Sequence, residues 1–487
     1  MSKPTRLAVL SIFIAPLLGL SVLSSGYAFG AEEKTVEEKI DLILKKPVIK
    51  DATVGVLAVS LIDGKLVDYN SEKLFIPASN MKLLTGAAAL EILGGDYRFR
   101  TTIYGTTNIT KKGVLEGNLI LKGCGDPTLA TYKNYGIESL LSDTIEELYN
   151  KGLRVIKGDI LVDETFFDSQ RLGSGWMWDD EQYGYSAQVG ALSLNENVIV
   201  VRITPGKSAG DPIDVQLIPS TDYIEIINEA ITCSANTKSD ISVERSKAQN
   251  KILIKGEIAE GSDPVIRTRT IEEPGFYAGT VFKESLESNG IDVYGRVRSG
   301  VAKKGIELKV INSVPLSEIV ECMMKNSDNF YAEQIIKTIG AEVMGAGSWS
   351  NGIKAVKQFL CDIGIDATQL RMVDGSGLSR YNLLSPQLVV NLLKYMYSET
   401  FLTSLPMAGV DGTLKNRMKG TPLEGNLKAK TGTMSGVSAL SGYITTESGD
   451  VIAFSIMINN YAKSSKPIKI IEDEIAEIIY AAREVNK

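Results

Sequence analysis

The chain has 487 residues, a formal net charge of −7 and no histidine. At about 100–200 residues per domain this length predicts two to four domains, and the apolar share of 44% excludes long disordered or collagen-like regions. The absence of histidine excludes a Ser-His-Asp triad, a Cys-His pair and a histidine-rich zinc site. If the chain is an enzyme, its proton transfers depend on Lys, Asp, Glu, Tyr or Cys. The acidic charge, with no Lys/Arg block longer than a doublet, argues against nucleic acid as a partner.

The N-terminus has the pattern of a secretory signal peptide. Lys3 and Arg6 precede an apolar run over residues 7–22, and residues 28–30 (AFG) fit an A-x-G cleavage site. An uncleaved membrane anchor is the alternative, but the run is short and interrupted by Pro16, which favours removal of residues 1–30. No later segment reaches the ~18–20 apolar residues of a membrane helix. We therefore expect an exported chain of the periplasm or the extracellular cell envelope, with no transmembrane segment after signal removal.

The cysteines are scattered and form no C-x-x-C pair. Export permits a disulfide, but a chain of this size does not require one, so buried thiols and a single bridge both stay open. No histidine is present that could activate a cysteine nucleophile. We expect no metal and no cofactor. The four positions are Cys124, Cys233, Cys322 and Cys361.

The start of the chain predicts a sheet edge followed by a buried helix. Residues 36–44 have the pattern of a short helix. Residues 54–60 and 66–69 alternate around Asp63-Gly64, which indicates a hairpin. An apolar helix then begins near Ser79 and ends before Gly94-Gly95.

The middle of the chain is rich in short strand-like runs, and helices return after about residue 311. The last helix could be a membrane anchor, but interleaved acidic residues favour a helix packed on the sheet. An α/β domain split by a large insertion explains this order better than three consecutive domains. Strands are expected at 101–104, 118–122, 159–162, 198–203, 223–227, 239–244, 251–258, 293–297, 427–430, 439–445 and 451–458. Helices are expected at 274–289, 316–324, 330–339, 350–363, 385–396 and 466–485.

Ser79-Asn80-Met81-Lys82 is the first chemical candidate. The i, i+3 spacing in the first turn of a helix puts the serine hydroxyl and the lysine amine on one face, within hydrogen-bond reach. A helix N-terminus disfavours a lysine cation, which favours a lysine that accepts the serine proton. Taken alone the motif is weak, and a helix start with a surface lysine is the alternative.

Two further motifs are equally weak when taken singly. Lys430-Thr431-Gly432-Thr433 has the pattern of an edge strand whose glycine lets a ligand backbone approach, with a lysine and hydroxyls to hold a carboxylate; a plain strand end is the alternative. Ser-x-Asn occurs at 193–195, 234–236 and 327–329. Ser327-Asp328-Asn329 is favoured because it directly precedes an apolar helix of the closing segment, whereas the other two lie in the β-rich insert.

Together, and in this order, the three motifs resemble the signature of β-lactamases and penicillin-binding proteins. Ser327 follows Ser79 by 248 residues, which is too long a gap for a compact β-lactamase, and Lys430 follows Ser327 by 103. Further stretches resemble the class C low-molecular-mass penicillin-binding proteins, the D-alanyl-D-alanine carboxypeptidase/endopeptidases. These stretches are ASNMKL (78–83), GDPTL (125–129), GWMWDD (175–180), ALSLNEN (191–197), SDNFYAE (327–333), DGSGLSR (374–380), GVDGTL (409–414) and KTGT (430–433).

The resemblance implies an α/β (α+β) fold and a nested domain order. A β-lactamase/transpeptidase-like domain, with an antiparallel sheet flanked by helices, would carry two nested β-rich inserted domains. The catalytic domain would comprise residues 31–97 and 311–487, inserted domain II residues 98–205 and 262–310, and inserted domain III residues 206–261.

The implied activity is that of a serine D-alanyl-D-alanine carboxypeptidase/endopeptidase, which acts on peptidoglycan stem peptides and is acylated by β-lactams. Ser79 would attack the penultimate D-Ala carbonyl, and Lys82 would accept its proton. Lys82 must then be neutral, so its pKa must fall by about 3 from about 10.4; burial, the helix terminus and Lys430 favour this. Ser327, with Lys430, would relay a proton to the leaving amine. Asn329 would hold the substrate amide and orient Lys82.

The remaining assignments concern substrate binding. By resemblance, Thr431 and Thr433 flank Gly432 and bind the terminal carboxylate, and the backbone N–H groups of Ser79 and Thr433 form the oxyanion hole. Asp163 resembles an acidic position that faces the amino end of the stem-peptide side chain in some members. A turn-capping aspartate is the alternative for Asp163.

Two other function classes stay open on the sequence. One is a non-catalytic penicillin-binding sensor or cell-wall-binding module, which would acylate without turning over peptide. The other is a β-lactamase-like hydrolase, which requires fast deacylation. The sequence also leaves open the balance among carboxypeptidase, endopeptidase and transpeptidase activity, the diamino acid preferred and the oligomeric state.

Overall fold

A computed structural model describes residues 35–129, 136–303 and 305–482, and from Val36 on these described residues form one compact unit. The expected signal peptide, residues 1–30, lies outside the described residues. In those three ranges no helix has the length and apolar character to cross a membrane, and no group of three His, Cys, Asp or Glu side chains could hold a metal ion. All four cysteines are free thiols in the structure.

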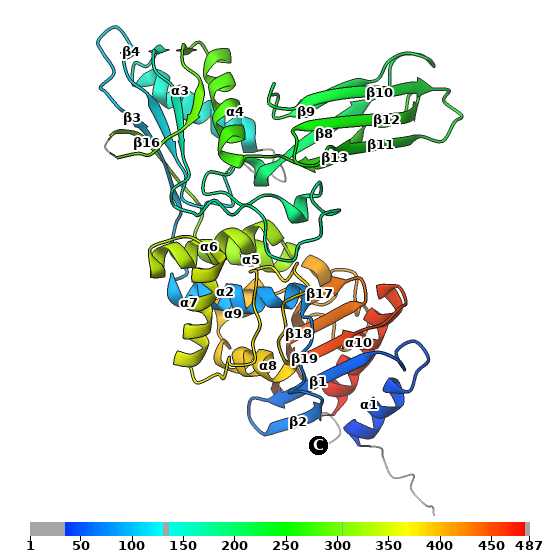
Figure 1. Cartoon of the computed structure of the whole chain (residues 1–487). Helices are drawn as coiled ribbons and strands as arrows, with labels where there is room; N and C mark the ends of the chain where they lie inside the picture. Colours follow the sequence, from blue (N-terminus) through cyan, green and yellow to red (C-terminus); the bar gives the residue numbers. More distant parts are fainter. Residues whose placement is uncertain (1–34, 130–135, 304, 483–487) are drawn as a thin grey trace, which may run out of the picture. The chain divides into compact units, whose positions relative to one another are not determined.

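A five-stranded antiparallel sheet joins the two ends of the described chain (Figure 1). Its order is β17-β18-β19-β1-β2, so β1 from the start of the chain pairs with β19 from its end. The predicted hairpins and the edge position of the KTGT strand are confirmed. The strands are β1 (Thr53–Ser60), β2 (Gly64–Tyr69), β17 (Leu427–Met434), β18 (Val437–Thr445) and β19 (Val451–Asn459).

Helices cover both faces of this sheet because both faces carry apolar side chains. α1 and α10 share one core with the sheet, in which Phe454 and Ile475 are fully buried. α2, α5, α6, α7, α8 and α9 share the other, which includes Tyr443 and Met457. α10 is therefore a core helix, as favoured from the sequence. The helices are α1 (Val36–Leu44), α2 (Met81–Ile92), α5 (Leu316–Asn326), α6 (Asn329–Met344), α7 (Trp349–Asp362), α8 (Pro386–Tyr395), α9 (Glu399–Ser404) and α10 (Ser465–Ala481).

Side-chain caps fix where several of these helices start. The residue before α6, Asp328, accepts a hydrogen bond from the backbone N–H of Tyr331, and Ser348, Ser385 and Ser398 cap α7, α8 and α9 in the same way. The Asp328 cap therefore puts Ser327 just before α6 and makes Asn329 the first residue of the helix.

The inserted part contains four further sheets in the described residues. Their orders are β15-β7-β5-β3-β16, β14-β6-β4, β13-β8-β9 and β10-β12-β11. α3 and α4 pack on the first of these in a separate apolar core. α3 was not expected, because its sequence is surrounded by strand-like runs. The elements are β3 (Arg100–Gly105), β4 (Val114–Leu115), β5 (Leu119–Lys122), α3 (Gly136–Asn150), β6 (Val155–Ile156), β7 (Ile160–Asp163), β8 (Val198–Thr204), β9 (Asp214–Ile218), β10 (Glu225–Cys233), β11 (Asp240–Arg245), β12 (Lys251–Ala259), β13 (Val265–Thr270), α4 (Pro274–Ser288), β14 (Asp292–Val293), β15 (Val297–Ser299) and β16 (Ile306–Asn312).

Strand pairing in the insert bears on the expected domain boundaries. β16 pairs with β3, so the first inserted sheet ends next to the expected boundary at residue 311. The sheet β13-β8-β9 combines strands from both sides of the expected boundaries at 205/206 and 261/262. Because paired strands share one hydrogen-bonded sheet, we propose that inserted domain III extends from β8, which begins at Val198, to β13, which ends at Thr270.

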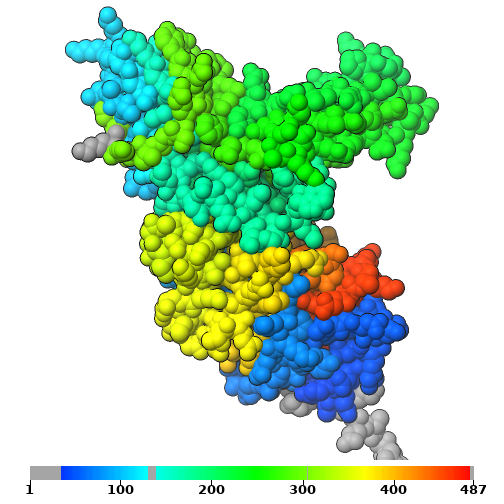
Figure 2. Space-filling model, in the orientation of Figure 1, coloured from blue at the N-terminus to red at the C-terminus, as the bar shows by residue number. Residues whose placement is uncertain are grey.

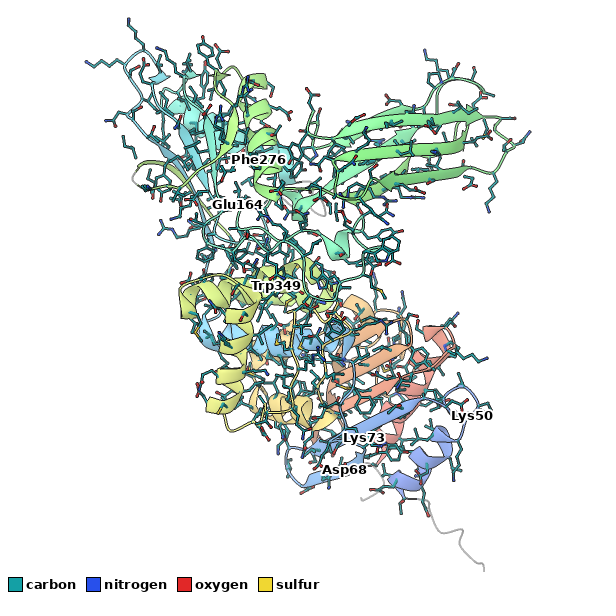
Figure 3. The ribbon with its side chains drawn as sticks, in the orientation of Figure 1. Lys50, Asp68, Lys73, Glu164, Phe276 and Trp349 are labelled. Carbon is teal, nitrogen blue, oxygen red and sulfur yellow. The ribbon has the colours of Figure 1, made fainter. Side chains whose placement is uncertain are left out.

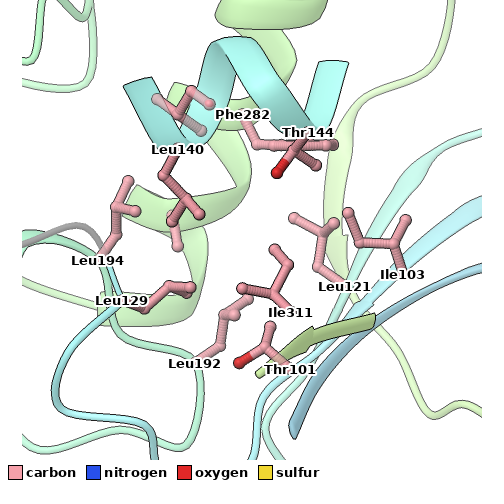
Figure 4. Close-up of a pocket in the computed structure, with 12 residues that line it drawn as sticks. Thr101, Ile103, Leu121, Leu129, Leu140, Thr144, Leu192, Leu194, Phe282 and Ile311 are labelled. Carbon is pink, nitrogen blue, oxygen red and sulfur yellow. The ribbon is translucent and has the colours of Figure 1, made fainter. Parts of the chain in front are cut away.

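A small apolar cavity of about 40 Å³ lies between the first inserted sheet and its two helices (Figure 4). Side chains from β3, β5, β16, α3 and α4 point into it, among them Ile103, Leu121, Ile311, Leu140 and Phe282. Its lining contains no titratable or nucleophilic side chain other than the hydroxyls of threonine. It is therefore a packing void of the insert rather than a site for chemistry.

Arg245 on β11 is the centre of a buried ion-pair network in the insert. Its side chain is 1% exposed, and its guanidinium lies 2.8 Å from Glu181 and 2.7 Å from Glu272. Removing the guanidinium would leave two half-buried carboxylates without their common partner. We expect Arg245→Met to lower the free energy of unfolding of the insert by about 3 kcal/mol. Denaturant unfolding followed by tryptophan fluorescence measures this.

Arg267→Met is the matched control for this prediction. Arg267 lies on β13 of the same insert but is exposed, and its guanidinium donates to the carbonyl of Ile266. The control should therefore unfold within about 0.5 kcal/mol of the wild type. An equal loss in the two variants would contradict the assigned role of Arg245.

Candidate active site

Ser79 lies at the entrance to α2, as predicted. A short 3-10 turn, η1 (Ala78–Asn80), leads directly into α2. Ala78, just before the serine, has φ = 46°, a left-handed conformation that is strained for an alanine and is often found at functional sites. Lys82 follows one turn later, is fully buried, and its Nζ lies 3.1 Å from Ser79 Oγ.

The amine of Lys82 is oriented by two oxygens that can only accept. Its Nζ donates to Asn329 Oδ1 at 2.6 Å and to the Ser376 carbonyl at 2.9 Å. The amide of Asn329 is itself oriented, because its Nδ2 donates to the Tyr185 carbonyl at 3.0 Å. In the neutral amine these two bonds use both N–H groups, so the lone pair faces Ser79 Oγ. The geometry therefore suits transfer of the serine proton to Lys82.

The protonation of Lys82 is shifted in the direction that this transfer needs. Burial lowers the pKa of Lys82 to about 8, although the negative charges of Glu333, Asp328 and Asp374 act in the opposite direction. The direction agrees with the fall expected from the sequence, and burial is its main cause. Of the acidic neighbours, Asp328 belongs to the second motif, whereas the sequence did not place Glu333 and Asp374 beside Lys82.

The second motif joins the site through Ser327. It ends α5 in a left-handed conformation with φ = 57°, which turns the chain toward α6. Lys430 Nζ donates to Ser327 Oγ at 2.8 Å and to the Thr431 carbonyl at 2.9 Å. Of the three Ser-x-Asn sequences, the one favoured by its position is thus the one in contact with the KTGT strand. Ser193 and Asn195 instead bond to backbone carbonyls within the insert.

Lys430 is a second buried lysine. Burial lowers the pKa of Lys430 well below its usual value, and the charge of Lys82 adds to this effect. Beside it, Thr431 Oγ1 donates to Thr413 Oγ1 at 2.8 Å and is nearly buried, whereas Thr433 is exposed. Of the two predicted carboxylate-binding hydroxyls, Thr433 is therefore the more accessible.

Two glycines let three segments converge on Ser79. A Cβ on Gly432 would lie 2.7 Å from the carbonyl oxygen of Pro77, and a Cβ on Gly377 would lie 1.8 Å from that of Ala78. β17 and the 374–379 loop therefore approach the backbone before Ser79 as closely as only glycine allows.

The hydroxyl of Ser79 opens onto a cavity of about 440 Å³. This volume falls in the usual range for small-ligand sites. Three parts of the chain line the cavity: the motifs, the loop after residue 376 and the insert segment 177–185, whose surface meets that of the catalytic domain in the space-filling view (Figure 2). The lining residues are Ser79, Met177, Asp180, Tyr185, Asn329, Gly377, Leu378, Arg380, Thr433, Met434 and Ser435.

Asp163 is not among the residues that line this cavity. It ends β7, is 1% exposed, and its Oδ1 accepts from the backbone N and the hydroxyl of Thr165 at 3.0 and 2.6 Å. Its Oδ2 accepts from the backbone N of Ala302 at 2.8 Å. These are the bonds of the turn-capping alternative. A contact of Asp163 with the stem peptide stays a prediction.

Sequence reasoning did not identify the buried carboxylates behind Lys82. Glu333 and Asp374 are fully buried and hydrogen-bond to the 374–379 loop. Both lie in stretches that carried the family resemblance, but neither has a motif of its own that indicates its partner. The lining residue Tyr185 was also missed, because it touches Asn329 only through its backbone carbonyl.

Gly377→Ala is expected to impair the site beyond its effect on stability. Gly364→Ala is the control: both glycines have left-handed φ (84° and 78°), but an added Cβ at Gly364 meets nothing within 4 Å. Both variants should lose about 1 kcal/mol of stability from the left-handed backbone conformation. Gly377→Ala should lose more, because its Cβ would meet the carbonyl oxygen of Ala78 at 1.8 Å. Only Gly377→Ala should also slow acylation, by about 100-fold, because it displaces the backbone before Ser79. Thermal unfolding and penicillin acylation rates separate the two effects.

The chain is similar to known proteins over most of its length. The family model described as D-Ala-D-Ala carboxypeptidase 3 (S13) matches residues 36–481. The chain is 39% identical to a D-alanyl-D-alanine carboxypeptidase of Actinomadura sp. (strain R39), over 95% of this chain and 88% of that protein. It is 28% identical to D-alanyl-D-alanine carboxypeptidase DacB of Haemophilus influenzae, over 87% of this chain and 88% of that protein.

Solved structures show the same similarity. Penicillin binding protein 4 (dacB) from Haemophilus influenzae superposes with a TM-score of 0.80 at 27% identity, and covers 91% of this chain and 99% of its own. A structure of the same protein complexed with a β-lactam superposes with a TM-score of 0.75 at 26% identity, with the same coverage. The predicted fold class is therefore confirmed.

Proposed function

Because the chain belongs to the D-Ala-D-Ala carboxypeptidase 3 (S13) family, we propose that it is a serine D-alanyl-D-alanine carboxypeptidase/endopeptidase of peptidoglycan stem peptides. The observation that carries this proposal is the 3.1 Å contact between Ser79 Oγ and a buried Lys82 that burial makes easier to deprotonate. The names of the Actinomadura and Haemophilus relatives support the reaction, and the β-lactam complex supports the inhibitor class.

Acylation begins at Ser79. Neutral Lys82 accepts the hydroxyl proton while Oγ attacks the carbonyl carbon of the penultimate D-Ala. The backbone N–H groups of Ser79 and Thr433 receive the developing negative charge on the carbonyl oxygen. The resulting bond is an ester between the serine and the shortened peptide.

The second half of acylation concerns the leaving group. Ser327 passes its proton to the amine of the departing D-Ala as the C–N bond breaks, and takes a proton from Lys430 Nζ, 2.8 Å away. Thr433, which lines the cavity, and Thr431 bind the terminal carboxylate, while Gly432 keeps the strand close to the serine. Water then attacks the ester and loses a proton, through Ser327, to Lys430. As the ester bond breaks, Lys82 returns its proton to Ser79 Oγ, which restores the starting state. The reaction as written needs neither metal nor cofactor.

β-Lactams enter the same pathway as substrate mimics. Attack of Ser79 opens the β-lactam ring. The ring nitrogen takes up the proton but stays covalently tethered to the acyl group, so no leaving group departs to make room for the hydrolytic water. We propose slow release of this adduct, which separates a penicillin-binding enzyme from the alternative of a β-lactamase-like hydrolase. Because peptidoglycan lies outside the cytoplasm, we expect the protein in the periplasm or at the extracellular cell envelope, and the signal-peptide pattern of residues 1–30 supports this.

Release of D-Ala from a stem pentapeptide by the purified protein tests the proposal. The expected result is stoichiometric D-Ala and tetrapeptide, with release blocked by prior incubation with penicillin. Acylation by penicillin without D-Ala release would instead support the sensor or wall-binding alternative. Rapid turnover of a chromogenic cephalosporin would support a β-lactamase-like hydrolase. Cleavage of defined cross-linked muropeptides, compared with D-Ala release from the pentapeptide, measures the endopeptidase activity relative to the carboxypeptidase activity.

A further inference from the structure

Glu333 is a buried carboxylate one helical turn after Asn329 on α6. Its Oε1 accepts from the backbone N of Ser376 at 2.8 Å. Its Oε2 accepts from the backbone N of Gly375 at 2.9 Å and from Trp349 Nε1 at 2.6 Å. All three partners are N–H donors, so the surroundings suit an ionised carboxylate, which only accepts.

The segment 375–376 is held from its other side by α2. Thr85 Oγ1 donates to the carbonyl of Gly375 at 2.6 Å, and Lys82 Nζ donates to the carbonyl of Ser376 at 2.9 Å. The N–H groups of this segment thus bond to Glu333, and its carbonyls bond to α2. Because the Ser376 carbonyl is one of two acceptors that orient the Lys82 amine, displacement of the segment would turn the amine away from the hydroxyl it must deprotonate.

A second buried carboxylate, Asp374, holds the same loop further along. It accepts from the backbone N of Gly377 at 2.9 Å and from Trp176 Nε1 at 3.0 Å. Trp176, from the insert, meets Trp349 of α7, labelled in Figure 3, edge to face with ring centroids 6.1 Å apart. Each indole therefore donates to one of the two carboxylates. The loop that presents the Ser376 carbonyl is fixed by both.

Glu333 also acts on Lys82 through its charge. Among the groups that raise the pKa of Lys82 against the effect of burial, Glu333 is the strongest. Burial and the neighbouring charge of Asp374 raise the pKa of Glu333 itself to about 7, so it is largely ionised in the alkaline range where Lys82 loses its proton. The other ionisable side chains that face Lys82 or Glu333 are Asp328, Lys337, Asp374 and Lys430.

We propose that Glu333 is a positioning residue of the reaction, which holds the 375–376 segment in place for Lys82 and supplies the main negative charge that acts on the Lys82 amine. This rests on the proposed function, because it takes Lys82 as the base. A purely structural role would not need the charge, since apolar residues of similar size fill a core at least as well as a buried ionised group. The contacts of Glu333 instead converge on the backbone next to the lysine.

The rate of Ser79 acylation by a penicillin, measured from about pH 5 to about pH 10, tests this inference. The wild type should slow as the pH falls through the pKa of Lys82, because only the neutral amine accepts a proton. The acid limb of the profile is the pH range in which the rate falls toward acid. Glu333→Gln removes a charge that raises the pKa of Lys82, so this limb should move down by about 1 pH unit. The plateau, which is the constant acylation rate above the pKa of Lys82, should also fall about tenfold or more. The amide NH₂ of glutamine cannot accept a hydrogen bond from the loop, so the 375–376 segment shifts.

Two further variants separate charge from packing. Glu333→Asp keeps the charge with a shorter reach, so its acid limb should stay within about 0.3 pH unit of the wild type while its plateau falls about tenfold. Glu342→Gln is the control, since Glu342 lies on the same helix but is exposed; both limb and plateau should be unchanged.

The outcomes are distinct. A lower plateau in Glu333→Gln with an unmoved acid limb, or a profile like that of Glu342→Gln, would show that Glu333 does not act on the lysine. If Glu333→Gln does not fold, Glu333→Asp decides alone, and a wild-type plateau there overturns the inference. A wild-type protein that is not acylated at Ser79 would overturn the proposed function instead.

Discussion

Ser79→Ala is expected to abolish both penicillin labelling and D-Ala release, with a loss of about four orders of magnitude or more. The alanine has no oxygen to form the ester, and no other serine of the described residues shares a hydrogen bond with Lys82 through its hydroxyl. The cost to stability should be small, because the lost hydroxyl makes one hydrogen bond at the edge of a cavity. Intact mass spectrometry after incubation with penicillin measures the labelling directly.

The wild type should gain one penicillin mass, and Ser79→Ala none. Ser220→Ala serves as the matched control, since Ser220 is exposed in the insert and away from the cavity; it should label like the wild type. A penicillin adduct that persists on Ser79→Ala would place the nucleophile elsewhere and remove the basis of the mechanism.

The catalytic domain could be predicted well because its elements follow simple periodic rules. The helix at Val36–Leu44 was predicted with these limits, and the KTGT strand was predicted at a sheet edge. In such elements the spacing of apolar residues reflects which faces are buried, so the spacing predicts the type of element. The Ser79–Lys82 pair could also be predicted, because the two residues are one helical turn apart in sequence and lie in contact in the structure.

The buried carboxylates near Lys82 and the domain boundaries within the insert could not be predicted, because they depend on contacts between distant parts of the chain. Glu333 and Asp374 lie 41 residues apart in sequence, and their roles follow only once α6 and the 374–379 loop are seen together. The boundary expected at 205/206 separated β8 from β9, yet these two strands pair in one sheet. Neither kind of contact leaves a periodic signal in one sequence.

The largest effect among the lysine variants is expected from Lys82→Met. Methionine fills a similar volume in the fully buried site but cannot accept a proton. Acylation by penicillin should slow by about 10²–10⁴-fold above the pKa of Lys82, where the wild-type amine is neutral; this is the usual contribution of a positioned general base. Lys394→Met, at an exposed position on α8, is the control and should acylate at the wild-type rate. Stopped-flow or quenched acylation rates measure both.

The pH profile identifies which of the two buried lysines is the base. With a pKa of about 8, Lys82 is protonated below that pH, so wild-type acylation should fall about tenfold for each further unit toward acid. The charge of Lys82 lowers the pKa of Lys430, and this coupling is reciprocal, so any positive charge on Lys430 disfavours protonation of Lys82. In Lys430→Met the acid limb should therefore persist, at the same pH as in the wild type or at a higher one. Lys82→Met should lose this limb altogether, because no titrating amine contacts Ser79. If the limb survived in Lys82→Met and vanished in Lys430→Met, the base would be Lys430, acting through Ser327, to which it lies 2.8 Å away.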